Sequence, residues 1–356
     1  MRSPGALCYI LASVLNDITA TLVSYRAAYT NRASFMLLAI AAIIAGLVLL
    51  VWSSDKFVDG AVGLAEGLGM SKAMIGLTIV ALGTSAPEIV VSIMAALAES
   101  PELALGNAVG SNIANIGLVL GVTALIAALP VTPGLLKQDL PALLAVTAAV
   151  GFLCSDYLLS QQDGWAMMAM LVLLMYLMFR YKKEHTDELI TPESEADIPD
   201  LGMKESIFWF ILGTTVLVGS SRLLVWGAIE VATALQISEV IIGLTIVAIG
   251  TSLPELAASV ASALRKHHDI ALGNIIGSNI LNLLAVLSAG AVIYPIEVSK
   301  QNFMRDYGAM SAITLLLALF IFWPRKQRQL SKVEGAILLS GYGASLGYLY
   351  QQTVTA

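Results

Sequence analysis

Apolar runs long enough to cross a lipid bilayer recur along almost the whole chain. A transmembrane helix needs about 20 consecutive, mostly apolar residues. About ten such runs lie at approximately 37–58, 72–98, 103–129, 138–156, 164–181, 206–231, 239–264, 270–295, 307–323 and 333–350. The composition agrees, because 58% of the 356 residues are apolar and only 12% are charged. The sequence therefore predicts an all-α polytopic membrane protein whose main surroundings are the lipid bilayer.

Two segments of the sequence are copies of each other. LGMSKAMIGLTIVALGTSAPE (68–88) matches LQISEVIIGLTIVAIGTSLPE (235–255), and ALGNAVGSNIAN (104–115) matches ALGNIIGSNILN (271–282) at the same offset of 167 residues. Each copy lies in a half with five expected spans. An odd number of crossings inverts the second half, and transporters with inverted-topology repeats place their substrate site between the repeats near the midplane. We therefore expect two inverted-topology five-helix repeats.

The repeat sets the expected division of the chain. An N-terminal extension, a first repeat, an acidic linker, a second repeat and a short tail are expected at 1–35, 36–181, 182–205, 206–350 and 351–356. Translation from Met36 is kept as an alternative, because Met36 opens directly into the first span and the preceding segment has no counterpart elsewhere in the chain.

Lys and Arg residues favour the cytoplasmic loops of membrane proteins. Here they cluster in alternate loops, around Arg180, Lys182, Lys183 and Lys204, around Arg265 and Lys266, and around Arg325, Lys326, Arg328 and Lys332. Lys300 and Arg305 do not follow this pattern. We expect a cytoplasmic linker, with both ends of the ten-helix unit outside, in the inner (plasma) membrane. The net charge of −6 lies largely in loops, and nothing favours a nucleic-acid partner.

Two glutamates lie within the apolar runs, one in each repeat. Glu88 and Glu255 occupy matching positions, and an ionised side chain at the centre of a membrane helix costs about 2.5–3.5 kcal/mol on insertion scales. One explanation is that each glutamate is protonated or paired with a basic residue. Arg222 is the only basic residue well inside a span, and one arginine cannot pair with two glutamates. We therefore favour a cation site.

Oxygen-bearing groups recur at helical spacing before each glutamate. Intervals of three, four and seven residues place them on one helix face, and the two sets are Ala81, Thr84, Ser85 and Glu88, and Ala248, Thr251, Ser252 and Glu255. A proline before each glutamate cannot donate a backbone hydrogen bond, so the carbonyl four residues earlier loses its helical partner. These prolines are Pro87 and Pro254, and the carbonyls belong to Gly83 and Gly250. We expect such freed carbonyls to be able to bind a metal ion.

The second copied block adds neutral oxygens at a spacing of four residues. In each repeat this spacing gives one polar helix face, formed by Asn107, Ser111 and Asn115 in the first and by Asn274, Ser278 and Asn282 in the second. The neighbouring glycines are expected to let helices pack closely, and they are Gly106, Gly110, Gly273 and Gly277. Asn112 and Asn279 lie off the polar face, so we interpret them as supporting or packing residues.

The predicted ligands are all oxygens, which hard cations prefer, and Ca2+ takes 6 to 8 of them in flexible geometry. Two glutamates balance one Ca2+, and the same oxygens could instead hold several Na+ ions. His267 and His268 fall in a predicted loop, where a solvated pair is favoured over a zinc site. No nucleotide-binding motif is present, so we expect transport driven by an ion gradient, with Ca2+ and Na+ as the bound ions and no resident cofactor.

These doubled GTSxPE and GNxxGSNxxN blocks resemble the calcium/cation antiporter superfamily, and most closely its bacterial sodium/calcium exchanger-like branch with ten helices, over essentially residues 36–350. The resemblance implies that Glu88 and Glu255 are carboxylates shared by Ca2+ and Na+. It also implies that hydroxyl oxygens come from Thr84, Thr251, Ser85, Ser252, Ser111 and Ser278, and carbonyl oxygens from Ala81 and Ala248. The family is expected to work by alternating access, with the first and sixth helices sliding past a core of the second, third, seventh and eighth. The serines on those two helices are Ser53, Ser54, Ser220 and Ser221.

One departure keeps a second function open. Many members of the family carry Asp where this chain has Asn282, opposite Asn115. The missing acidic group favours, as the alternative to Na+-driven exchange, a Ca2+/H+ or other divalent cation antiporter. An intramembrane enzyme would need a nucleophile or a catalytic metal arrangement, and none is visible; a scaffold without transport would have no reason to keep two buried glutamates. We expect a monomeric transporter that is not an enzyme.

Overall fold

A computed structural model describes residues 32–67, 83, 85–184, 201–264, 268–323 and 328–355, and almost all of them are helical. The first half consists of α2 (Arg32–Gly67), α5 (Ala86–Leu97), α6 (Pro101–Ala114), the π-helix η2 (Asn115–Leu120), α7 (Gly121–Ile126), β1 (Leu129–Pro130), the π-helix η3 (Leu135–Asp139), α8 (Leu140–Leu153), the 3-10 turn η4 (Cys154–Asp156), β2 (Leu158–Leu159) and α9 (Gln161–Glu184).

The second half follows the same order. It consists of α10 (Met203–Leu235), α11 (Glu239–Ile242), the π-helix η7 (Gly243–Val247), α12 (Ala248–Thr251), α13 (Leu253–Leu264), α14 (His268–Leu281), the π-helix η8 (Asn282–Val286), α15 (Leu287–Ile293), β3 (Ile296–Glu297), α16 (Lys300–Asn302), the π-helix η9 (Phe303–Tyr307), α17 (Gly308–Phe322), β4 (Gln329–Leu330) and α18 (Lys332–Thr355).

The helices occupy the positions of all ten expected spans. Seven helical stretches in the described residues are long and apolar enough to cross a membrane. The expected fifth and tenth spans correspond to α9 and α18, each of 24 residues, and the shorter apolar helix α5 is the described part of the second. The prediction of an all-α polytopic fold is confirmed.

Two helices are longer than the apolar runs predicted. We expected spans at 37–58 and 206–231, whereas α2 has 36 residues and α10 has 33. The apolar run of α2 ends near Lys56 and the helix continues beyond it. There Lys56 and Asp59 form an ion pair of 2.8 Å one turn apart, which supports the helical conformation. Helices longer than the hydrocarbon layer fit a membrane by tilting.

Two small antiparallel strand pairs show that the halves are inverted. β1 follows the third span of the first half, and it pairs with β4, which follows the fourth span of the second half. β2 follows the fourth span of the first half and pairs with β3, which follows the third span of the second. Loops after the third and fourth spans lie on opposite sides of a membrane within one half. Each pair can therefore form only if the second half is upside down relative to the first.

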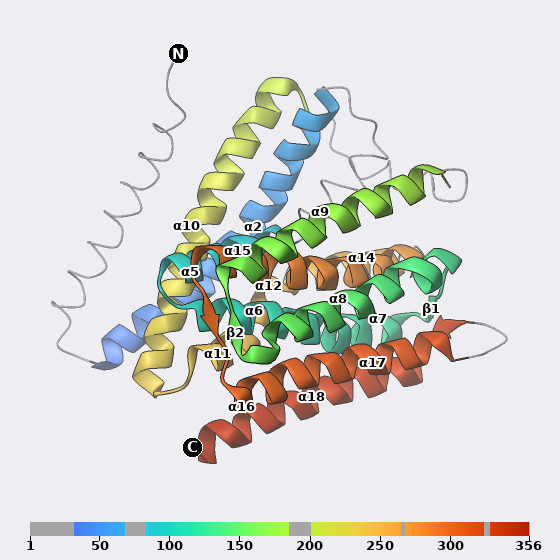
Figure 1. Cartoon of the computed structure of the whole chain (residues 1–356). Helices are drawn as coiled ribbons and strands as arrows, with labels where there is room; N and C mark the ends of the chain where they lie inside the picture. Colours follow the sequence, from blue (N-terminus) through green and yellow to red (C-terminus); the bar gives the residue numbers. More distant parts are fainter. Residues whose placement is uncertain are drawn as a thin grey trace.

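The helices α2 and α10 form an antiparallel pair (Figure 1). Glycines let their backbones approach: a Cβ at Gly60 would collide with the backbone of Phe210, and one at Gly213 would collide with that of Phe57. Gly46 and Gly227 make the same kind of close approach further along the pair. At the repeat offset Gly46 corresponds to Gly213, and Gly60 to Gly227. One contact motif thus appears twice in this pair.

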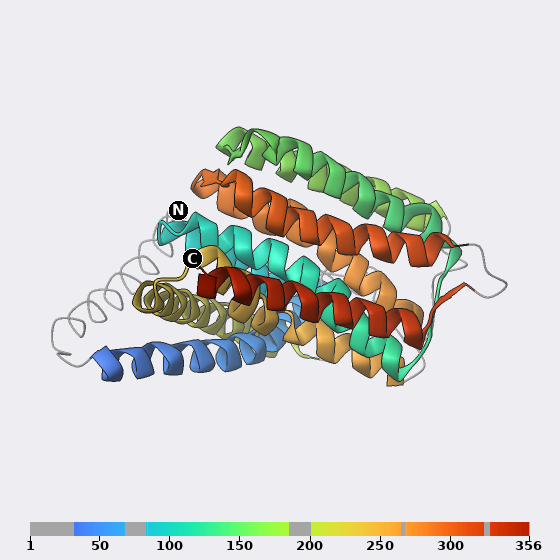
Figure 2. The same ribbon diagram turned by 90° about the horizontal axis from the view of Figure 1, so that it is seen from below.

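The apolar core has two parts. The larger cluster joins the first-half helices α6, α7 and α8 to the second-half helices α14, α15, α17 and α18. A smaller cluster joins α2 and α10 to α5 and to the beginning of α6. In Figure 2, α2 lies at one edge of the bundle, and the green α8 and α9 lie at the opposite edge. The α2–α10 pair therefore rests against the rest of the bundle through its own apolar surface.

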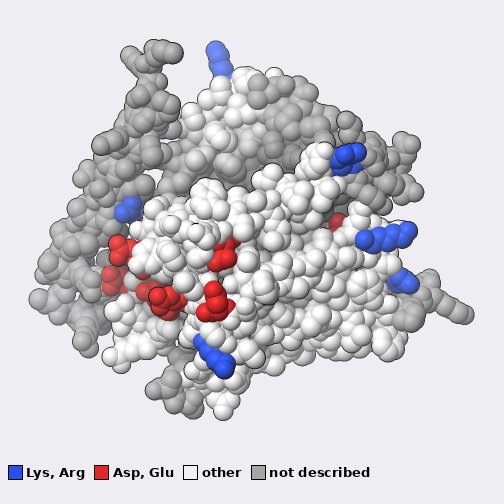
Figure 3. Space-filling view, in the orientation of Figure 1, with Lys and Arg blue, Asp and Glu red and all other residues white. Residues whose placement is uncertain are grey.

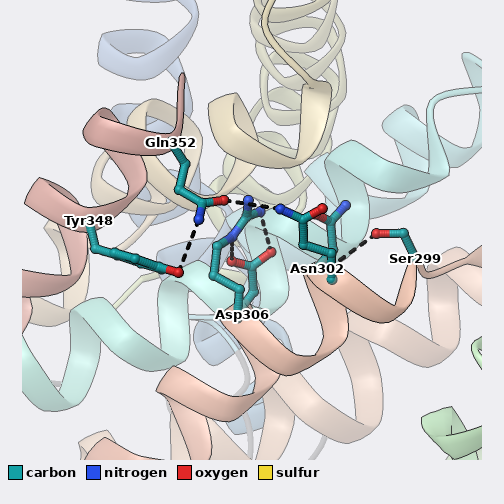
Figure 4. Close-up of polar contacts among 7 residues, drawn as sticks. Ser299, Asn302, Asp306, Tyr348 and Gln352 are labelled. Atoms are coloured by element: carbon teal, nitrogen blue, oxygen red, sulfur yellow. Dashed lines mark hydrogen bonds and ion pairs between the residues drawn. The ribbon is translucent and has the colours of Figure 1, made fainter. Parts of the chain in front are cut away.

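Polar contacts tie the end of α18 to the beginning of the α16–η9 helix (Figure 4). Gln301 donates to Gln352 at 3.3 Å, and Gln352 donates to the Tyr348 hydroxyl at 3.0 Å. Arg305 binds the Asp306 carboxylate through two nitrogens, at 2.6 and 2.8 Å. This pairing explains why Arg305 can depart from the loop charge pattern, because its charge is neutralised locally.

Candidate cation site

The second expected span of each repeat is interrupted next to its glutamate. α5 begins after Ser85, whose φ and ψ are −90° and 3°, and α12 and α13 are separated by Ser252, at −83° and 2°. Both residues adopt the bridge conformation, which is sparsely allowed and recurs at active sites. The prolines Pro87 and Pro254 follow directly in the first turn of the new helix segment. The backbone thus leaves helical geometry at Ser85 and Ser252, just before each proline. A main-chain N–H at the end of α12 donates to the Gly250 carbonyl, and the role of the freed carbonyls stays a prediction.

The carboxylates of Glu88 and Glu255 lie in the interior. Both residues are 0% exposed, although each carries an ionisable side chain. None of their four carboxylate oxygens has a hydrogen-bond partner among the described residues. Pairing with a basic residue, including Arg222, is therefore not observed for either glutamate. The two carboxylates lie close enough for their charges to interact, and each is beside a hydroxyl of the site, Thr251 for Glu88 and Ser278 for Glu255.

Hydroxyl groups cross between the repeats at this point. Ser85 donates to Ser278 at 3.5 Å, and Ser111 lies 3.3 Å from the Thr251 hydroxyl oxygen. In both contacts the GTSxPE block of one repeat meets the GNxxGSNxxN block of the other. The structure thus brings together the described residues Ser85, Glu88, Ser111, Thr251, Ser252, Glu255 and Ser278, which are all buried.

Asparagines complete the polar cluster unequally. Asn107 donates to the Glu88 carbonyl at 3.3 Å and accepts from Thr251 at 3.2 Å, whereas its counterpart Asn274 is only half-buried. Asn115 and Asn282 are buried, and the Oδ1 of Asn115 and both amide atoms of Asn282 lack a partner among the described residues. A buried polar atom is normally hydrogen-bonded. An unpartnered amide oxygen is therefore available to bind a cation.

The carbonyls of Gly83 and Ala248, which were predicted to bind a cation, both accept hydrogen bonds within the protein. The Gly83 carbonyl accepts a hydrogen bond of 3.2 Å from Ser54 on α2. The Ala248 carbonyl accepts from the Ser252 N–H at 3.0 Å and from the Thr251 hydroxyl at 3.4 Å, so it is already engaged. Ala81 and Thr84 lie outside the described residues. The roles of all four residues stay predictions.

The serines expected on the sliding helices mostly bond within their own helix. Ser53 donates to Leu50 and Ser220 to Leu217, each at 3.1 Å and at matching positions of the repeat. Ser221 also donates to Leu217, at 2.7 Å. Ser54 is the exception through its bond to Gly83. A serine of α2 therefore touches the interrupted backbone beside Glu88.

Sequence reasoning missed the π-helices next to the site. η2 begins at Asn115 and η8 at Asn282, which are matching positions of the two repeats. A π-turn inserts one extra residue and is frequent at functional sites. The apolar periodicity continues through both segments and no proline lies in either, so no local signal marks them.

The glycines of the second copied block were predicted to allow close helix packing, and the structure shows such packing in the first repeat. A Cβ at Gly106 would meet the backbone of η7 around Gly243, and one at Gly110 would meet Leu244 and Ala248. Gly273 and Gly277 have no such close neighbour among the described residues. The close approach of α6 to η7 brings Ser111 next to Thr251.

Chemically, the site offers two carboxylates and several neutral oxygens. No group of three or more His, Cys, Asp or Glu side chains occurs within the described residues. Each half of the chain, at 38–182 and at 205–351, is matched by the family model described as "Sodium/calcium exchanger protein". The chain belongs to the sodium/calcium exchanger family. The resemblance to the calcium/cation antiporter superfamily that the sequence indicated is therefore confirmed.

Individual relatives cover nearly the whole family region. "Putative antiporter CaxA" of Alkalimonas amylolytica is 44% identical over 317 residues, which are 88% of this chain and 98% of that protein. "Inner membrane protein YrbG" of Escherichia coli is 39% identical over 322 residues, again 88% and 98%. A structure of the sodium-calcium exchanger NCX_Mj soaked with Na+ and Sr2+ has a TM-score of 0.59 and 31% identity, and the match covers 88% of this chain and 98% of that one. This exchanger-family chain therefore has the exchanger fold.

Proposed function

We propose that this chain exchanges Ca2+ for Na+ across the membrane by alternating access. The observation that carries the proposal is the pair of fully buried carboxylates, Glu88 and Glu255, whose oxygens have no partner among the described residues and which meet where the repeats cross. A buried charge without a partner is strongly unfavourable. A divalent cation between the two glutamates removes that cost, and so do two Na+ ions.

The proposed ligands are the oxygens predicted from the repeat. They are the side chains of Glu88, Glu255, Thr84, Thr251, Ser85, Ser252, Ser111, Ser278, Asn115 and Asn282, with the carbonyls of Ala81 and Ala248 in sodium sites. Oxygen ligands of this kind suit Ca2+, which accepts 6 to 8 of them. The NCX_Mj structure supports the choice of ions, because that protein is a sodium-calcium exchanger studied with Na+ and Sr2+.

The proposed motion moves α2 and α10 together past the remaining helices. Its support is the separate apolar cluster beneath the pair and the glycine contacts within it. Inverted repeats allow such a motion to open the site to either side in turn. The Ser54–Gly83 bond joins the moving α2 to the site.

We place the chain in the inner membrane with its 182–205 linker in the cytoplasm, which puts the β2–β3 pair outside. Acidic residues gather near that pair, where Glu102, Glu239 and Glu297 lie close enough for their charges to interact. In Figure 3 the acidic side chains cluster toward this end, and several basic ones lie at the opposite end. Basic residues on the cytoplasmic side agree with this placement, and YrbG is by name an inner membrane protein.

The second candidate is a Ca2+/H+ antiporter. Asn282 favours it, because an amide replaces the acidic group common in the family and Glu88 or Glu255 can carry protons. The two functions differ in the gradient that drives Ca2+ movement. They are therefore separated by one experiment.

The test uses the purified protein in liposomes loaded with Na+ and diluted into Na+-free medium with labelled Ca2+. The expected result is Ca2+ uptake that follows the Na+ gradient and is lost in Glu88→Gln and in Glu255→Gln, because each variant removes half of the carboxylate charge. Uptake that ignores Na+ and follows an imposed pH gradient would establish the proton-coupled function instead.

A further inference from the structure

We infer that Asn279 is a positioning residue that makes Asn115 present its amide oxygen, and not its amide nitrogen, to the bound cation. The inference rests on the proposed cation site and adds a residue that lies outside its ligand set. A carboxamide has an acceptor oxygen at one end and an NH2 donor at the other. Only the oxygen binds a cation, so an asparagine ligand needs a neighbour that fixes its orientation.

Three groups form a relay with a single direction. The main-chain carbonyl of Asn112 can only accept a hydrogen bond, and it accepts from the Nδ2 of Asn279 at 3.4 Å. This bond turns the Oδ1 of Asn279 toward Asn115. That oxygen in turn accepts from the Nδ2 of Asn115 at 3.1 Å. Because the relay starts at a carbonyl, reversing either amide would break it.

The relay ends at the side-chain oxygen of Asn115. With its nitrogen held by Asn279, Asn115 leaves its Oδ1 buried and without a partner among the described residues. Asn115 lies one helical turn after Ser111, on the same face, and Ser111 contacts Thr251 of the other repeat. The oriented oxygen therefore belongs to the same polar cluster as the hydroxyl ligands.

The carbonyl that starts the relay lies at the end of α6, just before η2 begins at Asn115. A main-chain N–H at the helix end also donates to it. Because a carbonyl oxygen has two lone pairs, it can accept from Asn279 as well.

The equivalent relay, in which Asn112 would orient Asn282, does not form. Asn112, the counterpart of Asn279, donates its Nδ2 to the Met310 sulfur at 3.4 Å. At the repeat offset, Met310 corresponds to Leu143, whose side chain cannot accept a hydrogen bond. Neither amide atom of Asn282 has a partner among the described residues. One asparagine of the site is therefore oriented by a neighbour and the other is not.

The test compares Asn279→Ala with the matched control Asn112→Ala by equilibrium binding of labelled Ca2+ to the purified full-length protein in detergent. Both residues are 1% exposed and occupy equivalent positions, so both substitutions leave a similar cavity. Loss of a hydrogen bond that orients a metal ligand weakens affinity by about 10- to 100-fold. We expect Asn279→Ala to raise the Kd for Ca2+ by at least about tenfold and Asn112→Ala to raise it much less.

A double-mutant cycle separates positioning from a structural effect. A carboxylate presents oxygen in either orientation, so Asn279→Ala should not raise the Kd further when Asn115→Asp is already present. A structural defect would weaken binding equally in both backgrounds, and that result would overturn the inference, as would equal effects of Asn279→Ala and Asn112→Ala. If the unaltered protein bound no Ca2+ at all, the proposed function would fail first, and the inference with it.

Discussion

Charge at the site is set by two residues, Glu88 and Glu255. Their carboxylates are buried and unpartnered within the described part of the chain, and the polar groups around them are neutral hydroxyls, amides and carbonyls. Two negative charges balance one Ca2+. The amide of Asn282 is the position at which a single substitution changes that balance with the least disturbance, because neither of its polar atoms has a described partner.

Asn282→Asp is expected to tighten Ca2+ binding by about tenfold, because Ca2+ affinity rises with the number of charged ligands. The measurement is the Kd for labelled Ca2+ in detergent at low Na+. Asn274→Asp is the control, since Asn274 lies two turns earlier on α14 and is only half-buried. An unchanged or weaker affinity in Asn282→Asp would place that residue outside the site.

At this scale, the sequence predicts residues better than it predicts their partners. The glutamates, hydroxyls and interrupted helices follow from the doubled motif and the prolines. The bond from Ser54 to Gly83 and the relay through Asn279 depend on which helices touch, and residue spacing along one helix carries no such information. Asn279 lies off the polar face of α14, so helical periodicity alone indicated a supporting or packing residue and could not name the residue that it supports.

Among the helices, the α2–α10 pair is held by backbone contact. The pairing brings Gly60 against Phe210 and Gly213 against Phe57, with no room for a Cβ on either glycine. Cores that must accept extra atoms lose about 1–3 kcal/mol of stability. The pair should therefore respond to the addition of a single methyl group.

Gly60→Ala is expected to lower the stability of the protein by about 1–3 kcal/mol, because the new Cβ would meet the Phe210 backbone. Thermal unfolding in detergent measures the change. Gly219→Ala on α10 is the matched control, since no described atom lies within 4 Å of its Cβ position. Equal loss of stability in both variants would mean that helix propensity and not the α2–α10 contact is responsible.

The ten helix positions could be predicted because about 20 apolar residues are needed to cross a bilayer. The extra length of α2 could not, because beyond its apolar run the helix carries charged residues, such as Lys56 and Asp59, which pair within it. The π-helices also left no local signal. Both segments, η2 and η8, are almost entirely buried and begin at matching asparagines.

As a whole, the molecule is two inverted halves with one shared site. The strand pairs β1–β4 and β2–β3 fix the inversion, and the contacts of Ser85 with Ser278 and of Ser111 with Thr251 join the halves at the glutamates. Inversion was predictable from five spans per repeat. Which ion drives transport was not, because oxygen ligands of this kind can hold Na+ or Ca2+, and a carboxylate can also carry a proton.

The central claim is that Ca2+ and Na+ occupy the same oxygens in turn, and its most direct test is competition at equilibrium. Labelled Ca2+ is bound to the purified protein while Na+ is raised at constant ionic strength, with Glu88→Gln as the control for binding elsewhere. We predict that Na+ displaces Ca2+ cooperatively, because more than one Na+ is needed to balance the two glutamates, and that Glu88→Gln abolishes the displaceable binding. Ca2+ binding that is unaffected by Na+, or that survives in Glu88→Gln, would contradict a shared site.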